Sequence, residues 1–237
     1  MKPELKQFTA TVGGQTITFE TGQLAMQAGG AVTVRLDGSL ILATATMSDE
    51  PREGINFFPL SVDYEERMYA GGRIPGGFFR REGRPTENAI LTNRLTDRPL
   101  RPLFPKDMRN DVQVIMYAIS ADPENPLDVI AINAASAAVL ISDAPWGGPV
   151  AAVRIGLING EFVVNPTYAE LEESDLDLRV AGTREALLMV EAGASEVDED
   201  TMGRALSYAH EAMQPLIDAQ LAPVSYTHLR AHETKAN

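Results

Sequence analysis

Apolar and polar residues alternate along much of this chain with a period of two, which predicts β-strands. The stretch "FTATVGGQTITFE" alternates on both sides of Gly13-Gly14, and "VTVRLDGSLILATATM" does so around Asp37-Gly38, so each predicts a hairpin. The same pattern predicts strands at 57–67 and 111–120, a hairpin about Asn159-Gly160, and two more strands within 176–193.

Three stretches follow a helical pattern instead. Thr86 is a good N-cap for a helix through "ENAILTNRLTD", which we expect Pro99 to stop. Residues 126–142 are apolar on nearly every side and rich in alanine, which predicts a helix buried against a sheet. A last helix is expected over roughly 201–219. Strands in two blocks, divided near 143–148 and interrupted by helices, predict an α+β fold.

Composition narrows the class of protein. The chain has 237 residues and no cysteine, which excludes disulfides, thiolate metal sites and thiol nucleophiles. It contains no run of about 18 apolar residues, so we expect no membrane span. Together these features favour a soluble, cytoplasmic protein.

Charge is divided unevenly along the chain. The formal net charge is −13, yet residues 67–109 hold ten of the twenty Lys and Arg against four acids, a local balance of +6. The rest of the chain carries −19. Such a field repels a polyanion everywhere except at one place, so it would steer a polyanionic partner to that segment. The alternative is a basic patch that holds the protein's own acidic segments.

The most unusual stretch is "RIPGGFFRREGRP", residues 73–85, whose glycines and prolines predict a loop. Exposed aromatic rings can stack on unpaired bases, and arginines pair with phosphates as planar forks. This combination predicts binding of single-stranded nucleic acid. The alternative is a hydrophobic plug against a partner subunit, with the arginines pairing carboxylates there. The candidate RNA-binding residues are Phe78, Phe79, Arg80, Arg81 and Arg84, together with Arg94, Arg98 and Arg101, which follow at helical spacing.

Little in the sequence indicates a catalytic centre. No cluster has zinc-ligand spacing, so no metal site is predicted, and His210 is interpreted as an ordinary packed or solvated residue. His228 and His232 lie in "VSYTHLRAHETKAN", which has no periodicity and resembles a sequencing adapter read in frame. We therefore interpret residues 224–237 as a non-native scar.

A family resemblance covers residues 5–222. "ERMYAGGRIPGGFFRREGRPTENAILTNRLTDRPLRPLFP" closely resembles the first of the two RNase PH-like cores of bacterial polynucleotide phosphorylases. "GSLILATATMS", "DVIAINAASAAVLISDAPWGGPVAAVRIG" and "LDLRVAGTREALLMVEAGASEV" resemble the same family.

The resemblance implies an RNase PH-like fold of the ribosomal-protein domain-2-like β-α-β type. It implies an N-terminal subdomain over 5–143, a C-terminal subdomain over 146–212, and the start of a helical linker at 213–222. It also implies a homotrimeric ring whose channel admits the 3′ end of RNA. Phe78, Phe79, Arg80 and Arg81 match the family's FFRR loop, which grips the strand.

The implied activity is phosphorolytic 3′→5′ exoribonuclease activity, in which inorganic phosphate releases nucleoside diphosphates from single-stranded RNA with Mg²⁺ assistance. Degradosome-type proteins are possible partners by the same resemblance. Family members are much longer and hold their phosphate and metal sites mainly in a second core. Here "DVIAINAAS" stands where active RNase PH domains carry a Gly-Thr-Arg phosphate clamp. No catalytic residue is therefore assigned, and we expect this chain alone to be inactive. Two alternatives remain: a stand-alone RNase PH-like enzyme, and a non-catalytic, RNA-binding ring subunit of exosome type.

Overall fold

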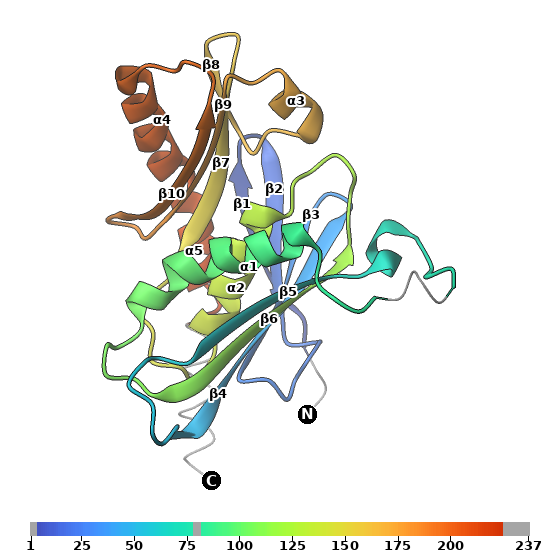
Figure 1. Cartoon of the computed structure of the whole chain (residues 1–237), viewed down its shortest axis with the longest axis vertical. Helices are drawn as coiled ribbons and strands as arrows, with labels where there is room; N and C mark the ends of the chain where they lie inside the picture. The colour runs from blue at the N-terminus through green and yellow to red at the C-terminus, as the bar shows by residue number, and fades with distance from the viewer. Residues whose placement is uncertain (1–3, 78–81, 225–237) are drawn as a thin grey trace.

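In the part of the chain that the structure describes, the protein consists of two β-sheets, in which all but one pair of neighbouring strands are antiparallel, and of helices that pack on them (Figure 1). The computed structural model describes residues 4–77 and 82–224. Phe78, Phe79, Arg80 and Arg81 lie outside these ranges, as do His228 and His232. The strands of the first sheet lie in the order β1-β2-β3-β4-β6-β5 and those of the second in the order β10-β9-β7-β8.

The first sheet is built from β1 (Lys6–Val12), β2 (Gln15–Thr21), β3 (Gly30–Leu36), β4 (Ser39–Pro51), β5 (Leu60–Glu66) and β6 (Asn110–Ser120). The second is built from β7 (Ala151–Ile158), β8 (Glu161–Val164), β9 (Leu176–Gly182) and β10 (Leu187–Ala194). The helices are η1 (Met68–Gly71), α1 (Glu87–Leu100), η3 (Arg101–Leu103), α2 (Asp128–Leu140), α3 (Tyr168–Glu172), α4 (Glu199–Ala212) and α5 (Gln214–Leu221).

One strand pair of the first sheet is parallel. β1 to β4 form antiparallel neighbours, whereas β5 runs parallel to β6, with Leu60 opposite Val112 and Tyr64 opposite Met116. A parallel pair requires a long crossover. That crossover contains η1, the Gly/Pro-rich loop, α1 and η3, so all of the segment 67–109 lies within it.

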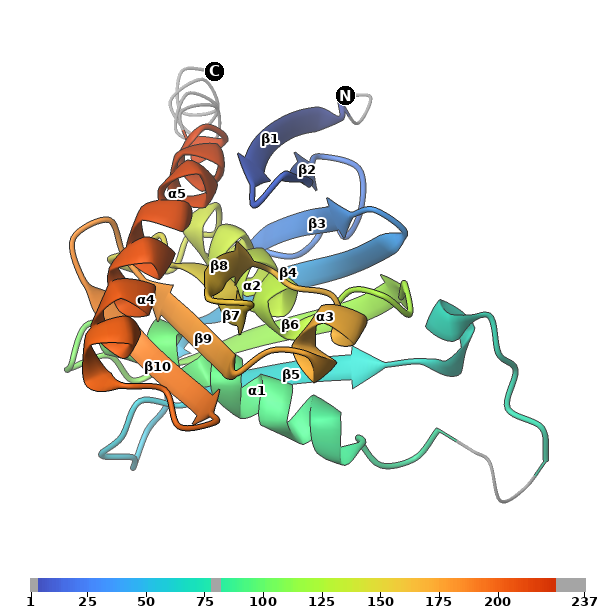
Figure 2. The same cartoon turned by 90° about the horizontal axis from the view of Figure 1, so that it is seen from above.

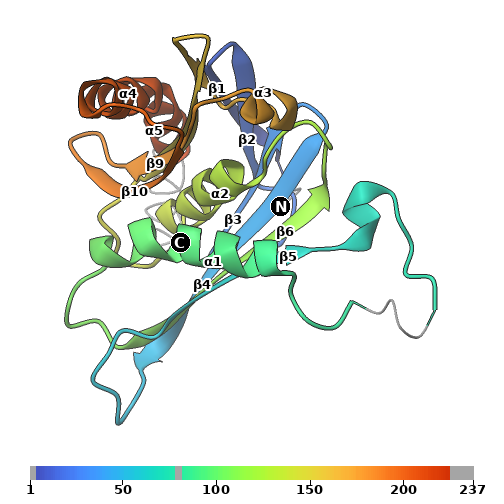
Figure 3. The same ribbon diagram turned by 45° about the horizontal axis from the view of Figure 1, so that its top comes forward.

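Helix α2 forms the centre of the core. It packs against β3, β4 and β6 of the first sheet and against β7 of the second. Every residue from Val129 to Val139 is buried, as the all-round apolar pattern predicts. α1 lies beside α2 on the same face of the first sheet, while α4 covers the second sheet (Figure 3).

A buried polar network joins α2, β7 and α5. The Asn133 side-chain amide donates to the carbonyl of Ala152 at 2.8 Å and accepts from its N–H at 3.1 Å. Ser136 donates to Gln220 of α5 at 2.6 Å and accepts from Val150 N–H at 2.9 Å. These polar groups tolerate complete burial because they satisfy one another.

Three predicted boundaries are wrong. Pro99 does not stop α1, which reaches Leu100 because the proline falls in the last turn, where its missing N–H costs one hydrogen bond, and because Leu100 is fully buried. The strand predicted at 57–67 begins only at Leu60, directly after Pro59. The single helix expected over 201–219 is two helices meeting at Met213, and Pro215 lies in the first turn of the second.

One short helix, α3, was not predicted from the sequence. Thr167 and Glu170 form a reciprocal capping box that begins α3, and "TYAE" is the sequence signature of that motif. Across residues 4–77 and 82–224, no helix combines the length and the apolar character needed to cross a bilayer.

Candidate functional site

The two arms of the basic loop extend away from the body of the protein (Figure 2). Residues 72–77 and 82–86 are exposed, and Ile74 has 87% of its surface accessible. Thr86 ends the second arm by capping α1, where its side-chain oxygen accepts from Ala89 N–H at 3.1 Å. The loop therefore begins directly after η1 and ends at the capped start of α1.

Two of the predicted RNA-binding arginines have free guanidinium groups within the described parts of the chain. Arg84 is exposed on the second arm of the loop. Arg94 lines a cleft of about 730 Å³ beside α1. No ion pair to either is found among the described residues, so both can take an external anion.

Arg98 and Arg101 contact the chain itself. Arg98 pairs with Glu191 at 2.8 Å and so fastens α1 to β10. Arg101 pairs with Asp97 and donates to the carbonyls of Phe58 at 3.1 Å and Leu60 at 3.2 Å. The helical spacing of the three arginines is as predicted, but their surroundings differ.

The cleft lies where α1 meets the second sheet. Its walls include Tyr64 at the end of β5, Arg94 and Arg98 of α1, Tyr168 of α3, and Arg179 of β9. Tyr64 is 1% exposed, and its hydroxyl has no hydrogen-bond partner among the described residues. Burial, followed by the charge of Glu66, raises the pKa of Tyr64 far above its usual value, so the hydroxyl stays protonated.

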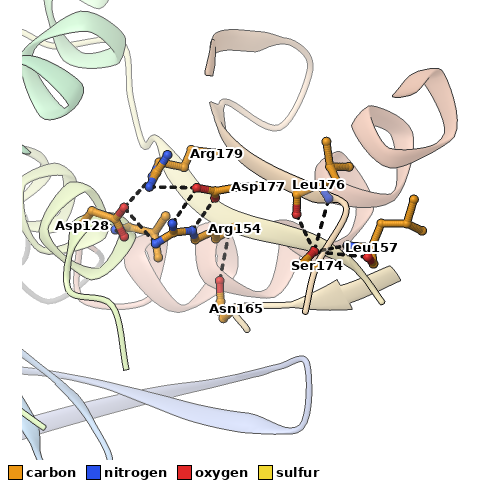
Figure 4. A network of polar contacts seen from close by, with 9 residues as sticks. Asp128, Arg154, Leu157, Asn165, Ser174, Leu176, Asp177 and Arg179 are labelled. Carbon is orange, nitrogen blue, oxygen red and sulfur yellow. Dashed lines mark hydrogen bonds and ion pairs between the residues drawn. The ribbon is translucent and has the colours of Figure 1, made fainter. Parts of the chain in front are cut away.

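Four charged side chains form a closed ring (Figure 4). Three of them, Asp128, Arg154 and Arg179, line the cleft. Arg154 donates to Asp177 from Nε at 2.6 Å and from Nη2 at 2.8 Å, and its Nη1 lies 3.4 Å from Asp128. Arg179 closes the ring with Asp128 at 2.6 Å and Asp177 at 3.2 Å. Two cations and two anions leave no net charge.

The ring shifts the pKa of two of its members, Asp177 and Arg179. Burial opposes ionisation of Asp177, but the hydrogen bonds and charges of Arg154 and Arg179 outweigh it and hold the pKa of Asp177 below its usual value. Burial likewise disfavours the Arg179 cation, yet Asp128 and Asp177 raise its pKa. Asp177 and Arg179 therefore stay charged at neutral pH, and both guanidinium groups of the ring are already paired with carboxylates.

The expected clamp position is filled by the chain's own acid. "DVIAINAAS" forms the first two and a half turns of α2, and Asp128 Oδ1 accepts from Val129 N–H at 2.8 Å at the start of that helix. A helix N-terminus is where an external phosphate would otherwise bind. Asp128 thus takes the place of the anion.

A Gly-Thr-Arg triplet does occur elsewhere, at 182–184 in the β9–β10 turn. Thr183 N–H donates to Ala186 O at 2.9 Å, and Arg184 pairs with Asp218 of α5. His210 Nε2 lies 3.1 Å from Thr183 O, which suits the interpretation of His210 as a packed residue. These contacts make the triplet a structural turn.

The sequence did not predict the ring, because α2, β7 and β9 supply its members from separate stretches of the chain and each member stands in an ordinary strand or helix pattern. Only the alternation on β7 and β9 could have indicated that Arg154 and Arg179 share a face. They lie directly opposite each other in the register of the two strands.

Comparison with known proteins shows the family. Residues 13–145 match the 3′ exoribonuclease family, domain 1, and residues 148–212 match domain 2 of the same family. The chain belongs to the 3′ exoribonuclease family. The RNase PH-type fold is thereby confirmed.

Two curated relatives share the name polyribonucleotide nucleotidyltransferase. The chain is 56% identical over 220 residues to the polyribonucleotide nucleotidyltransferase of Thermus thermophilus. The aligned residues make up 93% of this chain and 31% of the relative. A relative of the same name from Dehalococcoides mccartyi is 54% identical over 213 residues. The chain thus spans about a third of the length of these relatives, and its resemblance to polynucleotide phosphorylases is confirmed.

Solved structures share the fold at low identity. Rrp46 from rice (Oryza sativa) superposes with a TM-score of 0.70 at 14% identity, covering 94% of this chain and 95% of that one. A chain of the Archaeoglobus fulgidus exosome with RNA bound to the active site gives a TM-score of 0.67 at 15% identity, covering 90% of this chain and 87% of that one. These two likenesses support the fold alone.

Proposed function

We propose that this chain is the first core of a phosphorolytic 3′→5′ exoribonuclease, a polyribonucleotide nucleotidyltransferase, and that it binds and threads single-stranded RNA. The observation that carries the proposal is the 56% identity to a relative of that name over 220 residues. The exposed basic loop supports the role in RNA binding.

The proposed RNA contacts are two stacking rings and four cations. Phe78 and Phe79 stack on bases, and Arg80 and Arg81 pair with phosphates, as the matching family loop implies. Arg84 and Arg94, which have no ion pair among the described residues, add two more cations along the path of the RNA. Arg98 and Arg101 hold α1 in place for that path through their pairs with Glu191 and Asp97.

The ring of Asp128, Arg154, Asp177 and Arg179 argues against chemistry in this core. Its arginines are paired with aspartates, and the N-terminus of α2 is occupied by Asp128. Among the described residues no three His, Cys, Asp or Glu gather as metal ligands, and the family resemblance assigns the Mg²⁺ site to a second core. The proposal therefore places the phosphate and Mg²⁺ sites in a second core.

The remaining parts of the proposal follow the family. Residues 5–143 and 146–212 are two subdomains, and 213–222 begin a helical linker. The complete enzyme is a cytoplasmic homotrimer, and degradosome-type proteins are its partners. The exosome-type alternative is less favoured, because the likeness to exosome chains is 14–15% in identity.

The proposal is tested by identifying the nucleotides that the full-length enzyme releases from RNA. Incubated with oligoadenylate, inorganic phosphate and Mg²⁺, it should release nucleoside diphosphates, and omission of phosphate should stop the release. A hydrolytic nuclease would release monophosphates without phosphate, and a ring subunit without catalytic function would release nothing. Either result would refute the proposal.

A further inference from the structure

The base of the RNA-binding loop is closed by an acid. The first arm is fixed to the sheet, because Ala121 N–H, just after β6, donates to Ala70 O of η1 at 3.0 Å. Arg73 N–H donates to Met68 O at 2.9 Å and tightens the same turn. The start of the loop is therefore attached to the folded core.

The second arm is attached to the first through Glu82. One carboxylate oxygen of Glu82 accepts from the backbone N–H of Met68, and the other lies 3.6 Å from Nη1 of Arg67. Arg67 also pairs with Glu65 of β5, which anchors the guanidinium to the sheet. One carboxylate thus bridges two points fourteen residues apart.

Thr86 adds a second bridge. Its hydroxyl donates to Glu66 at 2.9 Å while accepting from Ala89 N–H. The strand end at 65–68 and the helix start at 82–86 are therefore held side by side. The two described arms of the loop, residues 72–77 and 82–86, are therefore joined at this closed base.

The negative charge of Glu82 makes it possible to distinguish a role in holding the loop from a direct electrostatic effect on RNA. An acid within a positive, RNA-binding segment repels phosphate, so on charge alone its removal should strengthen binding. An acid that holds the loop in its binding arrangement should do the opposite, because apparent affinity falls with the fraction of molecules in the competent arrangement. The two roles predict opposite changes in Kd.

We propose that Glu82, together with Arg67, is a positioning residue for RNA binding. It closes the base of the loop and so orients the residues that contact RNA. The proposal rests on the proposed function, since it assumes that the loop binds RNA. It assigns no contact between Glu82 and RNA. Arg67 acts through Glu82.

The experiment measures the Kd of fluorescein-labelled oligoadenylate for the full-length enzyme that contains this chain, without phosphate. Glu82→Ala should raise Kd about three- to tenfold. Glu82→Gln should raise it less, because the amide oxygen still accepts from Met68 N–H. The matched control is Glu87→Gln, which removes one negative charge from the exposed first turn of α1, next to the same loop. Its Kd should stay the same or fall.

A double-mutant cycle tests the part played by Arg67. If Arg67 acts through Glu82, Arg67→Gln should weaken binding in the wild type and add little in the Glu82→Gln background. An unchanged or lower Kd for Glu82→Ala overturns the proposal. So does an equal effect of Arg67→Gln in both backgrounds, which would mean that Arg67 contacts RNA directly.

The Phe78→Ala/Phe79→Ala variant separates the two proposals. If that variant binds as the wild type does, the loop is not the RNA contact, and the part of the proposed function that assigns RNA binding to the loop fails. If it binds weakly while the Glu82 variants bind normally, only the positioning role fails.

Discussion

The guanidinium group of Arg154 donates to both carboxylate oxygens of Asp177, at 2.6 and 2.8 Å, across neighbouring strands β7 and β9. Arg154 is almost fully buried, with 8% of its side chain exposed, so loss of this partner leaves its charge poorly compensated. Asp177→Ala should therefore lower the free energy of unfolding by about 2–3 kcal/mol. This is less than for a fully buried pair, because Asp177 is 34% exposed and Arg154 keeps Asp128.

Urea unfolding of the chain measures this loss. The matched control is Asp218→Ala, which removes a pair with Arg184 at a site where both side chains are more than half exposed. That change should cost less than about 1 kcal/mol. Equal losses for the two variants would contradict a stabilising role for the ring.

The same pair predicts a dependence on pH. Because the folded-state pKa of Asp177 lies below its unfolded value, its contribution is fully present above the unfolded pKa, about 3.9. The contribution is lost as pH falls through the folded pKa. The stability difference between wild type and Asp177→Asn should hold from about pH 7 to 5 and shrink below about pH 4. Urea midpoints across this range provide the measurement, and a difference that grows toward acid would reverse the assigned sign.

Stacking by the two phenylalanines predicts a loss of affinity that salt does not alter. In the full-length enzyme, Phe78→Ala/Phe79→Ala should cost roughly 2–6 kcal/mol of binding to oligoadenylate if both rings engage a base, because each base–aromatic stack is worth about 1–3 kcal/mol. Kd measured at several salt concentrations should give a line parallel to that of the wild type. A changed slope would mean that phosphate contacts had been lost as well.

The adjacent arginines predict the complementary result. Arg80→Ala/Arg81→Ala should flatten the plot of log affinity against log salt by about 0.7 for each lost phosphate contact. The same titration detects it. If the variant keeps the wild-type slope, the arginines pair with carboxylates of a partner subunit, and the loop is an interface.

This chain by itself should not carry out phosphorolysis. Arg154 and Arg179 are neutralised by Asp128 and Asp177, and Asp128 fills the start of α2, so a phosphate ion finds no free cradle there. Incubation of the chain with oligoadenylate, phosphate and Mg²⁺ should release no nucleoside diphosphate above background. Release that persists after further purification would show a catalytic site within this core.

Local chemistry determined which parts of the fold could be predicted. The hairpins at Gly13-Gly14 and Asn159-Gly160, and the buried α2, followed from patterns within a single stretch. The end of α1 did not, because burial of Leu100 outweighed the local preference of Pro99 to end a helix.

The site was less accessible to prediction. The loop residues stood out by composition, whereas the partners of Arg98 and Arg101 depend on how α1 packs against β5 and β10. Three of the four contacts in the charged ring join residues 23, 26 and 51 positions apart. The pairing of β7 with β9 and the packing of α2 against β7 bring them together, and alternation alone specifies neither.

The parallel pairing of β5 and β6 determines how much chain the crossover needs. A crossover must return along the full length of the strand, and the seven residues of β5 span about 23 Å. The fourteen residues of α1 span about 21 Å, so the helix covers nearly the whole return by itself. The part of the loop beyond its closed base, residues 73–81, is therefore not needed to span the distance between the strands. Its length and composition can vary without shifting the register of the sheet, and this makes the loop a place where the fold can gain or lose a binding specificity at little cost to its core.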